Sequence, residues 1–172
     1  STGGAINDNY NTFSGNTIVN GAYGFYIQPY SSIFGTGLTI TGNNITNQYY
    51  TAISLTYQYN TIITSNIIST NSSNTTFYGI NFNQVYQSAP GYIQVLKNKI
   101  TGGQGGYGIY TSNFSGASNA QTIIANNFIQ IGAGGNTSYG MYMTGYYGVR
   151  VFYNTVNVTS SSGYAYYHSS TS

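Results

Sequence analysis

The hexapeptide VLKNKI (95–100) decides the fold, because versions of it recur along the whole chain. Asn98 has an apolar residue three positions before it and another two positions after it. Five further segments share this arrangement: FSGNTI (13–18), ITGNNI (40–45), ITSNII (63–68), IIANNF (123–128) and VFYNTV (151–156). Counted between the asparagines, the repeat is 23 to 32 residues long. A repeat of this length indicates a stacked array of similar units.

Each copy has the alternation of a β-strand. Within VLKNKI and its relatives the apolar positions lie on one face of an extended chain, which is the period-two pattern of a strand. The abundance of Gly, Asn, Thr, Tyr and Ile also favours strands and turns. One repeat cannot bury its apolar face alone, so successive copies must stack. The sequence therefore predicts an all-β solenoid of about six coils.

A second pattern follows each of these asparagines and consists of a small residue followed by an apolar one. Its six versions are GFYI (24–27), AISL (52–55), GINF (79–82), GIYT (108–111), GMYM (140–143) and GYAY (163–166). We expect the second residue of each to point inward: Phe25, Ile53, Ile80, Ile109, Met141 and Tyr164. The length variation falls on residues 71–76 and 132–138, which we expect to form loops.

These two motifs resemble the right-handed parallel β-helix repeat family, over nearly all of residues 11–167. In that family a coil contains an apolar strand, then N-x-[IV], then a short G-[IVM]-x-[LIVF] strand. Stretches such as NNITNQYYTAISL (43–55) are also similar to secreted surface proteins of Bacteroidota-type bacteria that are rich in Asn, Thr and Tyr. The resemblance implies one parallel β-helix domain over residues 1–172, with a Ser-rich tail at 168–172. It leaves function open, because the family contains enzymes and non-enzymes.

The resemblance also implies a role for the repeated asparagine. In the family this residue adopts a left-handed backbone conformation at a tight corner, and the side chains of successive coils form a hydrogen-bonded ladder. Here the ladder would consist of Asn16, Asn43, Asn66, Asn98, Asn126 and Asn154. Lys97 and Lys99, on either side of Asn98, are then exposed residues of an ordinary turn.

The chain has very few charged side chains that could serve in catalysis or metal binding, since only 2 % of the residues are charged. Asp8 is the one acidic side chain, whereas glycoside hydrolases use paired carboxylates and calcium-dependent lyases need acidic clusters. A metal-free lyase that uses Lys97, Lys99, Arg150 or a tyrosine is an open alternative, but these basic residues form no constellation in the repeat. His168 falls in the Ser-rich tail, where we expect it to be solvated. We predict no catalytic residues, no metal, no cofactor and no enzymatic activity.

The composition of the chain excludes several classes of partner and site. A formal net charge of +2 is too small for a nucleic-acid surface. No apolar run is long enough to span a membrane, and the opening STGGAINDNY (1–10) is typical of a mature or truncated start. The chain has no cysteine, which excludes disulfides and thiolate metal sites. The likeness to secreted surface proteins favours an extracellular or cell-surface location.

Tyrosine is the outstanding surface candidate, with 21 residues in the chain. In the second strand of each coil we expect Tyr26, Tyr110 and Tyr142 to point outward, where they could contact another protein or a glycan. An ice-binding face is a weaker alternative. It would use outward Thr-x-Thr pairs, but these occur only in the early coils, as in Thr39 and Thr41.

We therefore expect a non-enzymatic extracellular structural protein, a β-helix module of a cell-surface adhesin, fibre or sheath. It would associate through its ends or its Tyr- and Asn-rich faces with itself or with other surface proteins. A carbohydrate-binding β-helix that takes polysaccharide is the alternative. Neither terminal stretch resembles a cap, so the chain is expected to be a segment of a longer solenoid or a unit that stacks into a filament.

Overall fold

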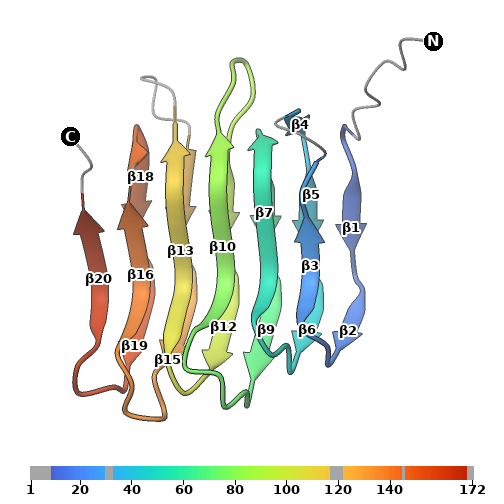
Figure 1. Cartoon of the computed structure of the whole chain (residues 1–172). Coiled ribbons are helices and arrows are strands. Elements are labelled where there is room, and N and C mark those ends of the chain that lie inside the picture. Colours follow the sequence, from blue (N-terminus) through green and yellow to red (C-terminus); the bar gives the residue numbers. More distant parts are fainter. Residues whose placement is uncertain (1–8, 30–32, 117–121, 145, 170–172) are drawn as a thin grey trace.

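The chain forms a parallel β-solenoid in a computed structural model (Figure 1), and the model describes residues 9–29, 33–116, 122–144 and 146–169. Every regular element in these ranges is a strand. Each coil runs through three short strands and then steps to the next coil, so that equivalent strands of successive coils lie side by side. All strand pairs are parallel, which is the arrangement expected when one coil repeats above another.

The first sheet contains the strand that leads into the asparagine. Its six strands, in spatial and chain order, are β1 (Thr12–Ser14), β5 (Thr39–Thr41), β8 (Ile62–Thr64), β11 (Gln94–Leu96), β14 (Thr122–Ala125) and β18 (Val149–Phe152). Each of the six predicted coils contributes one strand to this sheet, and six stacked strands correspond to about five complete turns of the solenoid.

The second sheet contains the strand that follows the asparagine. Its six strands are β2 (Thr17–Val19), β6 (Asn44–Thr46), β9 (Ile67–Thr70), β12 (Lys99–Gly102), β15 (Phe128–Ile131) and β19 (Thr155–Val158). They are only three or four residues long, because a tight corner precedes each of them.

The third sheet has the longest strands. Its main path contains β3 (Tyr23–Ile27), β7 (Thr51–Tyr59), β10 (Phe77–Tyr86), β13 (Gly106–Ser115), β16 (Ser138–Thr144) and β20 (Tyr164–Ser169). Two short strands pair with this path at its side: β4 (Gly35–Thr36) with β7, and β17 (Tyr146–Tyr147) with β13. The predicted loops at 71–76 and 132–138 lead into this sheet, and the second of them ends at Ser138, where β16 begins.

The core lies between the three sheets and is built from apolar columns. In the first sheet Ile40, Ile63, Val95 and Ile124 are in register and fully buried. The second and third sheets add the columns that contain Ile45 and Ile53, and the members of these columns in the inner coils are also buried. Burial of a side chain of this size contributes about 1.5–3 kcal/mol. The stacking of the coils is therefore held mainly by apolar columns, as the sequence predicted.

The register of the fifth coil differs from the prediction. In this coil Ile124, Asn127 and Ile129 are buried at the motif positions, whereas Asn126 and Phe128 are exposed. IIANNF contains two adjacent Ile and two adjacent Asn, so the apolar pattern fits either register equally well. The register that forms places Asn126 at a left-handed position. The alternative would have placed Ala125 there, which is less favourable because alanine tolerates this conformation poorly.

The sixth coil is also shifted, by two residues in its third strand. Tyr166 lies in register with Met141, the position predicted for Tyr164, and Ala165 takes the place predicted for Gly163. Strand β20 extends through His168, which pairs with Met143 and is exposed. The prediction that the tail begins at His168 is therefore wrong, because parallel pairing with β16 depends on backbone groups and continues past the last apolar residue. Residues 170–172 of that tail, and Asp8, lie outside the described residues.

No helix in the described ranges is long and apolar enough to cross a membrane.

Candidate functional site

The repeated asparagine forms a ladder along the corner between the first and second sheets. The Oδ1 atom of each asparagine accepts two hydrogen bonds from the previous rung, from the backbone N–H and from the side-chain Nδ2. At the centre, Asn66 donates both to Asn98, over 3.0 and 2.9 Å, and Asn98 donates both to Asn127, over 3.0 Å each. The ladder consists of Asn16, Asn43, Asn66, Asn98, Asn127 and Asn154.

The ladder confirms the predicted role of the asparagines, with Asn127 in place of Asn126. The inner rungs are buried, so their amides are available to each other and not to a ligand. The left-handed conformation, however, belongs to the residue before each rung and not to the asparagine itself. Those residues are Gly15, Gly42, Ser65, Lys97, Asn126 and Tyr153, with φ between 54° and 66°. A left-handed residue there turns the chain and leaves the asparagine side chain directed along the stack.

In the strands of the third sheet, two consecutive residues face the interior of the solenoid. This explains why the second motif begins with a small residue. Gly108 and Ile109 both face the interior, and a Cβ atom on Gly108 would lie 2.4 Å from Ile129 and 2.5 Å from the carbonyl oxygen of Gly140. Gly79 and Gly140 meet similar neighbours. Two inward residues in a row place the residues on either side of the pair outward, three positions apart.

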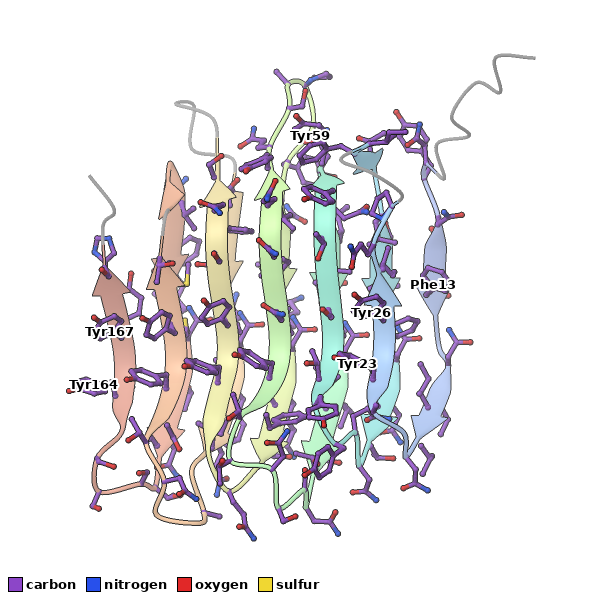
Figure 2. The ribbon with its side chains drawn as sticks, in the orientation of Figure 1. Phe13, Tyr23, Tyr26, Tyr59, Tyr164 and Tyr167 are labelled. Atoms are coloured by element: carbon purple, nitrogen blue, oxygen red, sulfur yellow. The ribbon has the colours of Figure 1, made fainter. Side chains whose placement is uncertain are left out.

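Those outward positions form two columns on the third sheet. One column reads Tyr23, Thr51, Tyr78, Tyr107, Tyr139 and Tyr164, and the other reads Tyr26, Ser54, Asn81, Tyr110, Tyr142 and Tyr167. Figure 2 shows Tyr164 and Tyr167 on the last strand of this face and Tyr23 and Tyr26 on the first. The tyrosines are consecutive from β10 to β20 in the first column and from β13 to β20 in the second, after Thr51 in the first column and Ser54 and Asn81 in the second.

We call the seven consecutive residues the tyrosine face: Tyr78, Tyr107, Tyr110, Tyr139, Tyr142, Tyr164 and Tyr167. Within each column the rings stack nearly parallel, with centroids 4.8 Å apart for Tyr78 and Tyr107 and 5.3 Å apart for Tyr110 and Tyr142. Between columns they meet edge to face, as Tyr139 and Tyr142 do at 4.9 Å. Such pairs add about 0.5–1.5 kcal/mol each beyond simple burial. The face is therefore rigid.

Packing of the rings also changes their acidity. Burial, reinforced by the neighbouring phenols, raises the pKa of Tyr107 to about 12. The same causes raise the pKa of Tyr78 and of Tyr142. These phenols stay protonated at neutral pH, so they can donate hydrogen bonds and are not available as general bases.

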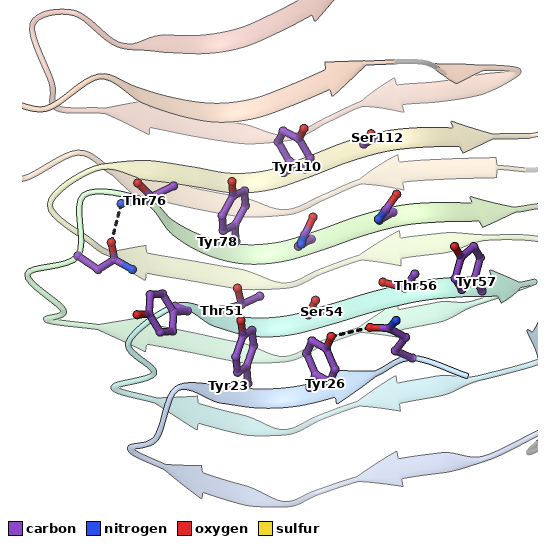
Figure 3. A pocket seen from close by; sticks show the side chains of 15 residues that line it. Tyr23, Tyr26, Thr51, Ser54, Thr56, Tyr57, Thr76, Tyr78, Tyr110 and Ser112 are labelled. Atoms are coloured by element: carbon purple, nitrogen blue, oxygen red, sulfur yellow. Dashed lines mark hydrogen bonds between the residues drawn. The ribbon is translucent and has the colours of Figure 1, made fainter. Parts of the chain in front are cut away.

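A groove of about 670 Å³ opens where the tyrosine columns are interrupted. Figure 3 shows its two sides, with Tyr23 and Tyr26 on one and Tyr78 and Tyr110 on the other. Thr51, Ser54, Thr56, Asn81 and Asn83 lie between them, Ser112 lies beside Tyr110 on β13, and all six supply hydroxyl or amide groups. Tyr26 and Tyr110 are three coils apart, which corresponds to about 14 Å of stacking.

The groove arises from differences between coils. In β7 and β10 the column of Tyr26 and Tyr110 contains Ser54 and Asn81, which are much smaller. Asn74 stabilises the rim because its Oδ1 accepts a hydrogen bond from the Thr76 backbone N–H and its Nδ2 donates to the Tyr49 carbonyl, at 3.0 Å each. No charged side chain lines the groove.

The structure separates the three tyrosines that the sequence predicted as a contact surface. Tyr110 and Tyr142 stack on neighbouring strands, whereas Tyr26 lies across the groove and is 58 % exposed. Sequence reasoning gave no role to Tyr78, Tyr107 and Tyr139 and predicted Tyr164 to point inward, whereas it is exposed. The signal was present as a Tyr directly before the small residue. The register shift in β20 brings Tyr167 into the column of Tyr110 and Tyr142.

The basic residues do not gather at one site. Lys97 lies at the corner between β11 and β12 and Lys99 begins β12, and both are exposed. Arg150 lies on the first sheet, with its guanidinium carbon 5.6 Å from the ring centroid of Phe152. The described residues contain no group of three or more His, Cys, Asp or Glu side chains that could hold a metal. The threonine rows proposed for ice binding are interrupted at Ile62, which pairs with Thr39.

Comparison with known proteins identifies the fold family. A family model described as a right-handed β-helix region matches residues 3–172. No curated protein and no solved structure matches the chain.

Proposed function

This chain belongs to the right-handed β-helix family, and we propose that within it the chain is a non-enzymatic extracellular module that binds neutral carbohydrate chains. The proposal rests on one observation, which is the groove on the third sheet with tyrosines on both sides and hydroxyl and amide groups between them. The extracellular location is part of the proposal, as predicted from the sequence resemblance.

The chemistry of the groove matches that of a sugar. A pyranose ring has apolar C–H faces that pack on aromatic rings, and Tyr23, Tyr26 and Tyr78 offer such rings beside the groove. Sugar hydroxyls both donate and accept hydrogen bonds, as do the amides of Asn81 and Asn83 and the hydroxyl of Ser54. Ligand sites of this kind combine an apolar surface with a few fixed polar groups.

The lack of charged side chains in the groove favours one class of glycan. An acidic polysaccharide would require cations to compensate for its desolvated carboxylates. The residues that line the groove include no Lys, Arg or His. We therefore propose a neutral polysaccharide, bound by packing and by neutral hydrogen bonds.

The inventory of side chains supports binding without catalysis. The whole chain has one acidic residue, which cannot supply the pair of carboxylates that glycoside hydrolysis uses. A tyrosine acting as a lyase base would need a lowered pKa, and the pKa values of Tyr78 and Tyr107 are raised. Both observations support a role in binding.

The test is binding to soluble neutral polysaccharides, such as dextran, mannan and β-glucan, measured by affinity electrophoresis and calorimetry. The decisive variant is Asn81→Tyr, which extends the tyrosine column across the groove and fills it. Tyrosine already occupies the same column in β13 and β16, so we expect the variant to fold. It should lose at least about tenfold in affinity, the effect of one lost anchoring contact of about 1.4 kcal/mol.

The matched control is Tyr153→Ser, which removes an 81 % exposed tyrosine at the corner between the first and second sheets. It should bind like the unmodified chain. The proposal is wrong if no neutral polysaccharide binds, or if Asn81→Tyr binds as well as the control. Preferential binding of acidic polysaccharides such as alginate would also contradict it.

The second candidate function is a structural module of a cell-surface adhesin, fibre or sheath. One observation favours it: the strands β1, β2 and β3 at one end, and β18, β19 and β20 at the other, have a neighbour on one side only among the described residues. Unpaired parallel edges bind further strands readily. The near absence of charge removes a common obstacle to such association.

A further inference from the structure

We propose that a second copy of this chain stacks head to tail on the first, with its β1, β2 and β3 strands paired to β18, β19 and β20. The inference rests on the second proposed function, for which it names the partner, and it is independent of carbohydrate binding. Three features of the two ends carry it: the direction of the asparagine ladder, the aromatic columns and the exposed core residues.

The asparagine ladder has a direction. Each rung donates to the Oδ1 atom of the next rung along the chain, so the ladder begins with a free acceptor and ends with a free donor. Asn16 Oδ1 accepts no hydrogen bond from the residues that the structure describes, and within the same ranges the backbone N–H of Asn154 has no acceptor. A second copy stacked head to tail would place the Oδ1 of its Asn16 beyond Asn154, as Asn154 lies beyond Asn127.

The two ends also carry the same aromatic columns. The column that ends at Tyr164 begins at Tyr23, and the column that ends at Tyr167 begins at Tyr26. Figure 2 shows these four residues at opposite ends of the same face. In the stack, Tyr164 would meet Tyr23 and Tyr167 would meet Tyr26 across the junction. Stacked tyrosines already occupy this geometry between Tyr142 and Tyr167, 4.7 Å apart.

The core columns are open at the ends. Ile40, Ile63, Val95 and Ile124 are fully buried, whereas Phe13, in the same column of the first coil, is 36 % exposed. At the other end Tyr166, in register with Met141, is 46 % exposed. A second copy would cover Phe13 and Phe25 with Val151 and Tyr166. Burial of apolar surface is favourable, so this contact favours the stack.

Electrostatics do not oppose the junction. Strands β1, β2 and β3 contain no charged residue, and β18, β19 and β20 contain Arg150 as their one permanently charged residue. Arg150 continues the column of Thr12, which would be its neutral neighbour in the next copy. Contacts that join one end to the other, without a closing rotation, produce open filaments.

A charge-swap experiment tests the stack on the second sheet, away from the carbohydrate groove. Thr17 and Thr155 begin and end one outward column, and Val19 and Asn157 begin and end another. All four residues are exposed, and Lys99 already occupies the first column in an inner coil. The like-charge variant carries Lys at all four positions. The opposite-charge variant carries Thr17→Glu and Val19→Glu with Thr155→Lys and Asn157→Lys.

Sedimentation velocity over a range of protein concentrations, at low salt and without glycan, gives the readout. The unmodified chain should form larger species as concentration rises. The like-charge variant should need about three- to tenfold higher concentration to do so, and the opposite-charge variant should need less than the like-charge variant. High salt should reduce the difference between them. Circular dichroism and thermal unfolding show whether each variant is folded.

Electron microscopy of the unmodified chain supplies a test that needs no variant. Six coils of about 4.8 Å give an axial repeat of about 29 Å per copy, so the filaments should be thin rods one solenoid wide with that repeat. A monomer at every concentration would overturn the proposal. Association that the two charge variants affect equally, or rods joined side by side, would overturn it as well. Each of these results leaves the polysaccharide-binding test unaffected.

Discussion

The asparagine corner and the outer face of the third sheet occupy the same coils and yet differ in kind. At the corner every coil has the same residue, and in the inner coils it is buried with the same hydrogen bonds to its neighbours. On the outer face the columns change from tyrosine to Thr51, Ser54 and Asn81 and back again. Regularity at the corner keeps the coils in register. Irregularity on the face makes a groove, so departures from the repeat point to function more clearly than the repeat itself does.

The largest expected effect is a loss of stability when the asparagine ladder is disrupted at its centre. Asn98→Ala removes the acceptor of two buried donors of Asn66 and the donor to the Ile63 carbonyl. Each buried polar group left unpaired costs about 1–3 kcal/mol, so we expect a loss of about 3 kcal/mol in the free energy of unfolding. Urea denaturation measures it.

The control is Asn16→Ala at the end of the ladder. The Asn16 side chain is exposed, and among the described residues it only donates, so its loss should cost about 1 kcal/mol. Equal losses at Asn16 and Asn98 would show that the ladder does not act as a continuous network.

An effect of intermediate size is expected at high pH, where the tyrosine face should lose part of its contribution to stability. The pKa of Tyr107 is about 12 in the folded chain, above the ordinary value of 10.0. The unfolded chain therefore releases this proton first, so the stabilisation is complete below about pH 10 and is lost as the pH rises toward 12. Thermal unfolding midpoints should fall across this range.

The variant Tyr107→Phe keeps the ring and removes the titrating group. It should show a shallower fall of the unfolding midpoint between pH 10 and 12 than the unmodified chain. Tyr78 and Tyr142, whose pKa values are also raised, account for part of the remaining slope. An identical slope in Tyr107→Phe would contradict the origin proposed here.

The smallest expected effect is a gain in stability at the corner. Lys97 is held at φ 58°, a left-handed conformation that glycine adopts freely. Lys97→Gly should therefore raise the free energy of unfolding by up to about 1 kcal/mol. The neighbouring Lys99→Gly, in strand β12, should lower it by about 0.5–1 kcal/mol, because glycine weakens a strand. Chemical denaturation of both variants compares them, and effects of the same sign would refute the difference.

The fold was predictable because its signal is repeated. Six asparagines, each between apolar residues at fixed distances, indicate the strands, the corner and the stacking without any knowledge of tertiary structure. The errors fell where the pattern is locally degenerate. IIANNF satisfies the motif in two registers, and GYAYYH offers several aromatic residues for one inward position. The choice there depends on backbone conformation and on pairing with the previous coil.

The candidate site was predictable only in part. Outward tyrosines follow from strand alternation, and Tyr26, Tyr110 and Tyr142 were identified in this way. Alternation cannot identify Tyr107 or Tyr139 on the same face, because two consecutive inward residues interrupt the period. The separation of Tyr26 from the other two tyrosines depends on the neighbours in β7 and β10, and these lie far away in the sequence.

By itself, the sequence determined the solenoid, its apolar columns, the asparagine ladder and the near absence of charge, since these depend on residue types repeated at short range. Only the tertiary structure decided which residues share a column, where the tyrosines stack and where a groove opens. The reason is that a column joins residues 23 to 32 positions apart, through backbone pairing whose register depends on the length of a variable loop in each coil.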